Sequence, residues 1–195
     1  MLVKSADKNY QVAFRRRIIS QYPLMDFRKF IQDIPDFPKP GIIFRDISPL
    51  LRNPEVLNRA AKDLANQMRN TPIDKVVAIE ARGFIFGALL AHLLNAGLVM
   101  VRKDGKLPGK VETITYASEY GSNLLAIQPD DIEKGENCLI CDDVLATGGT
   151  SDAASQLVER CGGNIVACAF LMELKSLGGR AKMDHYPLFS LFGID

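Results

Sequence analysis

The sequence predicts an α/β fold built on a central, mainly parallel sheet that is flanked by helices. Apolar runs of strand length alternate with segments of helical pattern, which is typical of parallel strands joined by helical crossovers. The runs around Leu98, Ile140 and Val166 are continuously apolar, as expected of strands that are covered on both faces. Ligands of such sheets bind beyond the carboxyl ends of the strands, so we expect the functional residues at that edge.

Residue types at the boundaries justify the elements of the N-terminal half. In order, the expected elements are a short helix at 27–34, a helix at 54–69, a strand at 75–80, a helix at 83–95 and a strand at 98–102. A cluster of prolines that begins at Pro35 forces an extended path after the first helix. Asn53 and Pro54 are residue types that begin helices, and Gly97 stands where a helix would end.

The C-terminal half is expected to hold more strands than helices. In order, the expected elements are antiparallel strands at 111–116 and 123–128, a strand at 137–141, a helix at 151–160, a strand at 164–172 and a last strand at 189–192. The alternation of Val111, Thr113 and Thr115 favours the first of these strands. The Gly- and Pro-rich composition of 103–110 predicts a mobile loop that precedes it.

The composition is typical of a globular protein. A chain of 195 residues with 47% hydrophobic and 24% charged residues is long enough for a sizeable core. The net charge of +1 gives no reason to expect a nucleic acid or a membrane as partner, and we find no transmembrane span or signal peptide. Cys138 and Cys141 would point to opposite faces of a strand, which is poor zinc geometry. We expect no disulfide framework and a location in the reducing cytoplasm.

The run from Cys138 to Thr150 carries the strongest functional signal. Its apolar strand ends in two adjacent carboxylates, Asp142 and Asp143, and a loop of small and hydroxyl residues then leads into a helix. Backbone N–H groups and the positive end of the helix dipole surround one point, which favours a phosphate. Carboxylates suit that site if the ligand also presents ribose hydroxyls and a divalent cation. The spacing excludes a P-loop and a dinucleotide fingerprint.

This run resembles the motif that binds 5-phosphoribosyl-1-pyrophosphate in type I phosphoribosyltransferases. The resemblance covers about residues 26–192, and it implies that family's fold, with a small hood and a flexible antiparallel loop. The implied division is an N-terminal extension at 1–25 and a single phosphoribosyltransferase domain at 26–195, with a hood at about 26–50, a core at about 51–175 and a C-terminal segment at 176–195. Cys141 departs from the family pattern, which usually has a branched apolar residue there.

Two further segments offer positive charge to a pyrophosphate. Residues 79–87 follow a strand and open a helix, and their backbone N–H groups and Arg82 would form a second anion site. This segment resembles the pyrophosphate loop of adenine phosphoribosyltransferases, where a non-proline cis peptide is frequent. Arg102, Lys103 and Lys106 lie in a run that resembles the family's Arg-Lys-x-Gly-Lys-Leu-Pro-Gly. A tight turn and a solvated charged face are the alternative interpretations of these two segments.

The segment 40–49 resembles the part of this family that reads adenine. Adenine presents an amino donor and a ring acceptor side by side, and an extended backbone offers a matching C=O and N–H. The resemblance assigns these groups to Ile43 and Arg45, with Phe44 stacking on the purine and Leu174 closing its other face. Hypoxanthine has the opposite polarity at the six position, and a mismatch would leave buried polar groups unpaired. A Pro- and Gly-rich cover of the core is the alternative.

The resemblance also implies catalytic roles. Ser118–Gly121 falls in the family's flexible catalytic loop, where Glu119 would handle the purine proton and Tyr120 would cover the reacting centre; a solvent-exposed hairpin tip is the alternative. The implied catalytic residues are Glu119, Asp142, Asp143 and Arg82. The implied contacts to the phosphoribosyl donor are Ala81, Arg82, Arg102, Lys103, Lys106, Tyr120, Asp142, Asp143, Ala146, Thr147, Gly148, Gly149 and Thr150. The required Mg2+ would be held mainly by the substrate, without direct protein ligands.

The implied activity is that of a pentosyltransferase in purine salvage. Adenine and 5-phosphoribosyl-1-pyrophosphate would give AMP and pyrophosphate, and the family is commonly homodimeric. One alternative is an enzyme of the same superfamily that acts on hypoxanthine, xanthine or a pyrimidine. The other is a non-catalytic sensor of the ribose donor that regulates transcription, although such members carry an added DNA-binding domain and a basic face, for which this chain offers little room or charge.

Overall fold

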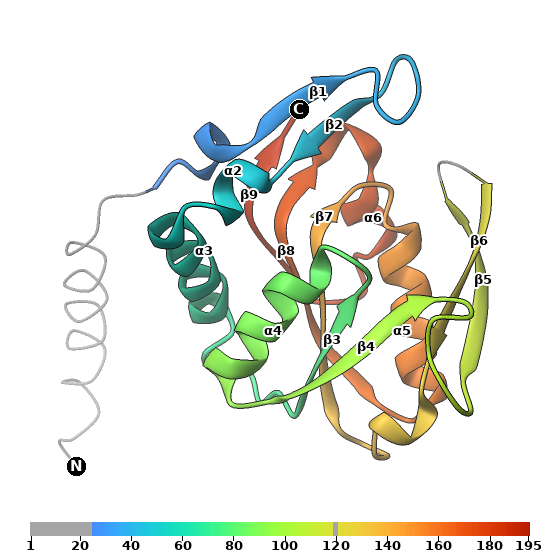
Figure 1. Ribbon diagram of the computed structural model, residues 1–195. Helices are drawn as coiled ribbons and strands as arrows, with labels where there is room; N and C mark the ends of the chain where they lie inside the picture. The colour runs from blue at the N-terminus through green and yellow to red at the C-terminus, as the bar shows by residue number, and fades with distance from the viewer. Residues whose placement is uncertain (1–24, 119–120) are drawn as a thin grey trace, which may run out of the picture. The chain divides into compact units, whose positions relative to one another are not determined.

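The computed structural model describes residues 25–118 and 121–195, so the expected N-terminal extension lies almost entirely outside the described residues (Figure 1). The described residues divide into two compact units, a smaller one that ends at Ile47 and a larger one at 48–195. Among the described residues, no helix combines the length and apolar character needed to cross a membrane.

A seven-stranded sheet forms the centre of the larger unit, in the order β5-β6-β4-β3-β7-β8-β9. Its strands are β3 (Lys75–Ile79), β4 (Gly97–Lys103), β5 (Glu112–Ser118), β6 (Gly121–Ile127), β7 (Asn137–Leu145), β8 (Asn164–Leu174) and β9 (Leu188–Ile194). Every neighbouring pair from β4 to β9 is parallel, whereas β5 and β6 form an antiparallel pair that joins the edge of β4. The mainly parallel sheet with an antiparallel extension confirms the predicted fold class.

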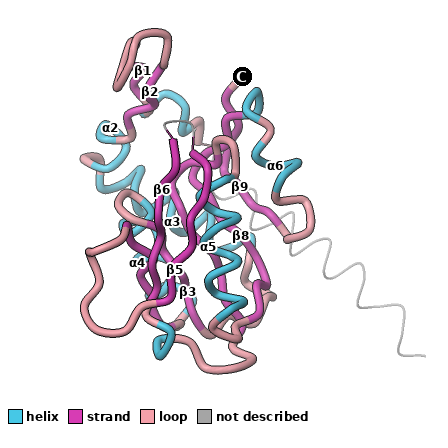
Figure 2. Tube along the Cα trace, turned by 90° about the vertical axis from the view of Figure 1, so that its right-hand side faces the viewer, coloured by secondary structure: helices cyan, strands magenta, loops and turns pink. Residues whose placement is uncertain are grey.

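Helices cover both faces of this sheet. They are α2 (Ser48–Leu51), α3 (Pro54–Gln67), α4 (Gly83–Leu94), α5 (Gly149–Arg160) and α6 (Gly179–Lys182), with 3-10 turns η2 (Pro129–Asp131) and η3 (Lys175–Leu177). Figure 2 shows α4 and α5 on opposite sides of the sheet. Alternate residues of β3 explain this, because Val77 and Ile79 join the core beneath α5 while Ala78 faces α4. A Cβ at Gly87 would overlap the Ala78 side chain, so α4 packs closely on β3 at this glycine.

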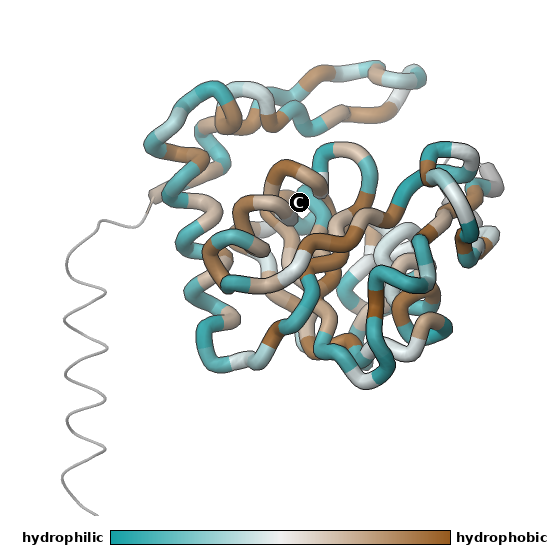
Figure 3. The backbone as a smooth tube through the Cα atoms, turned by 60° about the horizontal axis from the view of Figure 1, so that its bottom comes forward, coloured by the Kyte–Doolittle hydropathy of each residue, from teal (hydrophilic) through white to brown (hydrophobic). Residues whose placement is uncertain are grey.

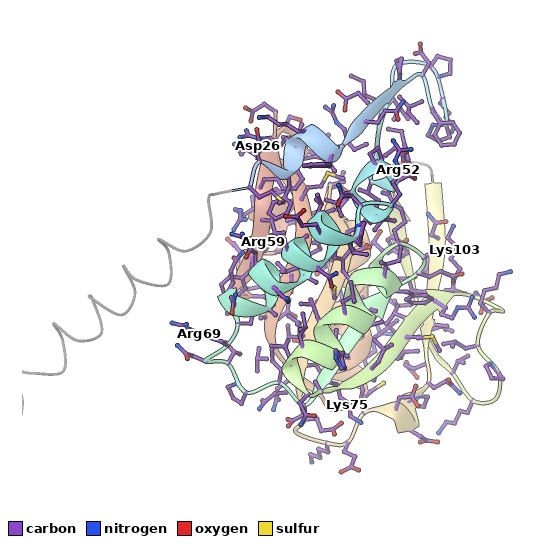
Figure 4. The ribbon with its side chains drawn as sticks, turned by 60° about the vertical axis from the view of Figure 1, so that its left-hand side comes forward. Asp26, Arg52, Arg59, Arg69, Lys75 and Lys103 are labelled. Atoms are coloured by element: carbon purple, nitrogen blue, oxygen red, sulfur yellow. The ribbon has the colours of Figure 1, made fainter. Side chains whose placement is uncertain are left out.

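Hydrophobic residues follow the strands of the larger unit, and hydrophilic residues follow its outer loops (Figure 3). The β3 segment from Val76 to Ile79 is almost completely buried. Figure 4 shows Lys75 at the amino end of β3 and Lys103 at the carboxyl end of β4, at opposite ends of the sheet. Lys103 therefore lies at the edge where the functional residues were expected.

The smaller unit, in its described part, is a two-stranded antiparallel ribbon that was not predicted. It contains η1 (Phe27–Phe30), β1 (Gln32–Pro35) and β2 (Ile43–Asp46). The helix expected at 27–34 was wrong beyond its first turn, since the chain continues into β1 and pairs with β2 from Gln32↔Asp46 to Pro35↔Ile43. Cross-strand pairing thus overrides local helical preference.

Candidate active site

Asp142 and Asp143 lie inside strand β7, which extends to Leu145 rather than ending at Cys141 as predicted. The strand continues because β8 stays in register beyond the carboxylates, at Asp142↔Phe170 and onward. Asp143 is only 4% exposed, and Asp142 is half-buried. The backbone N–H of Asp143 donates to Asp142 Oδ1 at 2.8 Å, which fixes the two carboxylates relative to each other.

The first residues of the β3–α4 turn contact this carboxylate pair. Arg82 Nε lies 2.9 Å from Asp143 Oδ2 in an ion pair. That contact lacks hydrogen-bond geometry, so Asp143 Oδ2 is a buried acceptor without a hydrogen-bond donor in the described part of the chain. A Cβ at Gly83 would lie 2.8 Å from Asp142 Oδ1. Glycine at the start of α4 therefore allows the two strand-to-helix turns to meet at the aspartates.

The electrostatics of the aspartates follow from their burial. Desolvation raises the pKa of Asp142 well above its ordinary value, and the neighbouring Asp143 charge raises it further. Desolvation also raises the pKa of Asp143, although the Arg82 guanidinium opposes this shift. Because both carboxyl groups have little contact with water and repel each other when ionised, the pair binds a proton more tightly than an isolated aspartate does. Ribose hydroxyls or a cation would supply the interactions that the ionised pair lacks.

The loop after β7, Ala146–Gly148, leads directly into α5. Gly148 has φ +79°, a left-handed conformation that glycine adopts without steric cost. Within the described residues no side chain caps the start of α5, so its first backbone N–H groups are available to an anion. The loop rests on α6, since a Cβ at Gly179 would overlap Ala146 O. The predicted phosphate-binding residues thus form one continuous turn with a fixed support.

The peptide bond between Glu80 and Ala81 is cis, as the resemblance to the pyrophosphate loop suggested. It precedes Arg82 and α4, whose start likewise has no side-chain cap among the described residues. The carboxyl ends of β3 and β7 are adjacent in the parallel sheet. The two candidate anion sites therefore lie at neighbouring strand ends, on either side of the aspartates.

Arg102, predicted to contact the donor, is already engaged with protein groups. Its Nη2 and Nε lie 3.0 and 3.3 Å from the two carboxylate oxygens of Glu80, and its Nη1 donates to Lys106 O at 2.9 Å. Lys103 N also donates to Glu80 Oε2, at 3.1 Å. Hydrogen bonding from Arg102 lowers the pKa of Glu80. Arg102 and Glu80 hold the cationic loop against the cis-peptide turn, while the Lys103 and Lys106 side chains stay exposed.

Glu119 and Tyr120 lie outside the described residues. The strands that flank them, β5 and β6, pair from Glu112↔Ile127 to Ser118↔Gly121. Strand β5 also lies along α5: Thr150 Oγ1 and Tyr116 OH are 3.3 Å apart, and Arg160 Nη1 donates to Thr113 O at 3.3 Å. Strand β5, which leads to Glu119, is thus bonded to α5, whose start belongs to the predicted phosphate-binding turn (residues 146–150, the phosphate turn).

The predicted adenine-reading residues lie on β2 of the smaller unit. Ile43 is 51% exposed, and Phe44 meets the ring of Phe37 edge-on with centroids 5.2 Å apart. Arg45 forms an ion pair with Asp33 on β1. Pro35 stands opposite Ile43 and has no N–H, so it cannot donate to the Ile43 carbonyl. Leu174, predicted to close the other face of the base, is the half-buried last residue of β8 in the larger unit.

Comparisons with known proteins identify the family. Residues 46–192 match the family described as "Phosphoribosyl transferase domain". A protein of Rhodopirellula baltica named adenine phosphoribosyltransferase is 50% identical over 170 residues, which cover 87% of this chain and 82% of that protein. One of the same name from Thermosipho melanesiensis is 51% identical over 171 residues, 88% of this chain and 98% of that protein. The chain belongs to the adenine phosphoribosyltransferase family.

Solved structures of this family share the fold. Adenine phosphoribosyltransferase from Thermoanaerobacter pseudethanolicus superposes with a TM-score of 0.85 at 44% identity, over 88% of this chain and all (100%) of that one. The Saccharomyces cerevisiae enzyme, solved in complex with an imino-altritol bisphosphate and adenine, gives a TM-score of 0.78 at 43% identity, over 85% of this chain and 96% of that one. These matches confirm both the fold class and the family that the motifs indicated.

The structure adds contacts that the sequence analysis missed. Glu80 was placed at the end of the strand expected at 75–80 and was not recognised as the partner of Arg102, and neither Tyr116 nor Gly179 was assigned a role. The Gly178-Gly179 pair was the available signal for Gly179, since adjacent glycines mark a turn or a close approach. The partners of Glu80 and Tyr116 lie 22 and 34 positions away along the chain. Local pattern carries no information on contacts at that separation.

Proposed function

We propose that this protein is an adenine phosphoribosyltransferase that transfers the phosphoribosyl group of 5-phosphoribosyl-1-pyrophosphate to adenine and releases AMP and pyrophosphate. The observation that carries the proposal is the aspartate pair, one buried and one half-buried, at which the two strand-to-helix turns meet. One turn supplies Arg82 and the other supplies the glycine-rich anion loop. About half of the residues are shared with relatives named for this activity, which supports the same proposal.

The reaction breaks the bond between ribose C1 and the pyrophosphate oxygen and forms one between C1 and adenine N9. The bond electrons leave with pyrophosphate, and C1 gains cationic character in between. Asp142 and Asp143 would accept hydrogen bonds from the ribose hydroxyls and place negative charge near that cation. The turn from Ala146 to Thr150 would hold the 5′-phosphate. The N9 proton of adenine would pass to Glu119.

The pyrophosphate would be held by cations at the neighbouring turn. Arg82, Lys103 and Lys106 would bind it, with the backbone of Ala81, while Arg102 and Glu80 hold the loop in place. Mg2+ would be bound mainly by oxygen atoms of the substrate. Asp142 and Asp143 offer hard oxygen donors that suit such a cation, with Asp143 Oδ2 paired to Arg82 at 2.9 Å. When bound, Mg2+ would neutralise charge on the leaving group.

The hood at about 26–50 would select the base. The Ile43 carbonyl and the Arg45 N–H match the donor–acceptor edge of adenine, Phe44 would stack on the purine, and Leu174 would close its other face. Exposure of Ile43 and the missing N–H of the opposing proline support this assignment. Tyr120 would cover the reacting centre. A homodimer in the cytoplasm completes the proposal, and four free cysteines suit a reducing compartment; light scattering of the purified protein tests the dimer.

The direct test is AMP formation from adenine and 5-phosphoribosyl-1-pyrophosphate, with and without Mg2+, and with hypoxanthine and guanine in parallel. We expect Mg2+-dependent turnover of adenine alone. Turnover of hypoxanthine would overturn the assignment of the hood residues. Intact donor binding without turnover of any base would favour the sensor instead.

A second assay addresses Glu119. Glu119→Ala should lower kcat about 100-fold or more while donor binding stays within about twofold, because general acid–base catalysis contributes on that scale. The matched control is Glu112→Ala at the other end of β5, which pairs with Arg160 at 3.7 Å and should leave kcat unchanged. An unchanged kcat in Glu119→Ala would remove Glu119 from the mechanism.

A further inference from the structure

The hydroxyl of Tyr116 lies 3.3 Å from the hydroxyl of Thr150. Thr150 is the second residue of α5 and belongs to the turn proposed to hold the 5′-phosphate. Tyr116 lies on β5 and packs against the core cluster, which fixes its ring. Tyr116 thus contacts a proposed ligand of the phosphate without itself being one of the proposed catalytic or ligand-binding residues.

Strand β5 is bonded to α5 at both ends of the helix. At the far end, Arg160 Nη1 donates to Thr113 O at 3.3 Å and pairs with Glu112 at 3.7 Å. At the near end, the contact is the hydroxyl pair of Tyr116 and Thr150. Because the helix and the strand are held together along their length, the Tyr116 ring stays beside Thr150.

The chemistry of a phosphate decides which hydroxyl donates. At neutral pH a phosphate monoester presents mainly acceptors, so a Thr150 hydroxyl that binds it must donate its hydrogen to the phosphate. In the structure the two hydroxyl oxygens are 3.3 Å apart, and either hydroxyl can donate to the other. Hydroxyl hydrogens rotate freely between such partners. Binding of a phosphate would therefore select one direction, with Tyr116 donating to Thr150 Oγ1.

We propose that Tyr116 is a positioning residue for the 5′-phosphate: its hydroxyl donates to Thr150 Oγ1 and thereby directs the Thr150 O–H at the phosphate. A chain of two hydroxyls polarised toward an anion strengthens both hydrogen bonds. The inference rests on the proposed function, since it takes Thr150 as a phosphate ligand. It concerns only ligands that carry a 5′-phosphate, and not the pyrophosphate or the base.

The test is calorimetric binding of AMP, ribose 5-phosphate, pyrophosphate and adenine to the wild type and to Tyr116→Phe. Phenylalanine keeps the packed ring and removes only the hydroxyl. We expect AMP and ribose 5-phosphate to bind about three- to tenfold more weakly, the scale of one hydrogen bond. Pyrophosphate and adenine should bind as before. Unchanged AMP binding, or an equal loss for pyrophosphate, would overturn the inference.

Two further variants separate positioning from packing. Tyr186→Phe is the matched control, because Tyr186 OH donates to Glu159 Oε1 at 2.8 Å near the other end of α5; it should bind every ligand as the wild type does. In a Thr150→Val background, Tyr116→Phe should have no further effect on AMP binding. A full additional loss there would show that Tyr116 acts without Thr150. Failure of the proposed function would be distinct, since the wild type itself would then make no AMP.

Discussion

Helices α3 and α5 begin in opposite ways. Asn53 caps α3, where its Oδ1 accepts hydrogen bonds from the backbone N–H groups of Glu55 at 3.1 Å and Val56 at 3.2 Å. Helix α5 begins at Gly149, directly after the left-handed Gly148, and within the described residues no side chain caps it. The first helix satisfies its own N–H groups, whereas the second leaves them for an anion.

The carboxylates near these two helices also differ in how fully other protein groups satisfy them. Asp63 on α3 is half-buried and is paired with Arg59 at 2.7 Å; Figure 4 labels Arg59 on this helix. Asp142 and Asp143, before α5, are adjacent like charges that burial has partly removed from water. Asp63 on α3 thus has a protein partner, whereas the two aspartates before α5 have lost contacts with water that the described protein groups replace only in part.

Of the substitutions that test this contrast between α3 and α5, Asp142→Asn should have the largest effect on activity. The substitution removes one of the two negative charges that would stabilise the cationic ribose C1 in the proposed reaction. We therefore expect kcat to fall about 100- to 1000-fold. The amide oxygen still accepts from Asp143 N–H, and the like-charge repulsion is gone, so the free energy of unfolding at pH 7.5 should rise by about 1 kcal/mol. Steady-state kinetics and urea unfolding measure the two effects, and an active or destabilised variant would contradict the assignment.

The pH dependence of the unfolding free energy is a second test of the raised pKa values of Asp142 and Asp143. A carboxyl whose pKa is raised by folding binds more protons in the folded than in the unfolded chain between its ordinary value of 3.8 and its raised value. Its contribution is therefore most favourable at low pH and is lost as pH rises through the raised pKa. We expect the wild type to lose more stability than Asp142→Asn between pH 5 and about 8. Parallel pH curves would mean that the pair is not protonated in this range.

Gly179→Ala should displace the turn at 146–150, because Gly179 on α6 packs against it. The added Cβ would overlap Ala146 O, and α6 cannot easily retreat because Arg180 Nη2 donates to Glu173 at 2.6 Å. We expect kcat/KM for the ribose donor to fall about tenfold or more, with a loss of about 1–3 kcal/mol in unfolding free energy. Gly178→Asn is the control, since asparagine tolerates its left-handed φ of +71° and no atom lies within 4 Å of the added Cβ. Equal effects of both changes would deny Gly179 a specific role.

Elements that depend on a local sequence pattern could be predicted from the sequence. The apolar runs located β3, β4 and β8, and the asparagine–proline pair located the start of α3 where the structure places it. The β1–β2 ribbon was missed because its pairing joins segments that look helical or irregular in isolation. Strand β7 was cut short at Cys141 because charged residues usually end a buried strand, whereas here β8 and the meeting of two turns hold them inside.

Motifs suggested candidate site residues but not the contacts between them. The aspartates, the glycine loop and Arg82 were proposed from motifs, and the structure places Arg82 against Asp143. The pairing of Arg102 with Glu80 could not be foreseen, because it depends on how β3 and β4 align in the sheet. The same holds for Tyr116 and Thr150, whose contact depends on how α5 lies on β5.

Asn53→Ala tests the capped helix α3 and should have the smallest effect on substrate binding. It removes the acceptor for two N–H groups of α3, so the free energy of unfolding should fall by about 1 kcal/mol. KM for adenine and for the ribose donor should stay within about twofold of the wild type, since α3 offers no groups to the proposed reaction. Asn53→Asp keeps the acceptor and should restore stability. A change in KM with Asn53→Ala would show that the capped and uncapped helices are not independent, and that stability at α3 is transmitted to the phosphate turn.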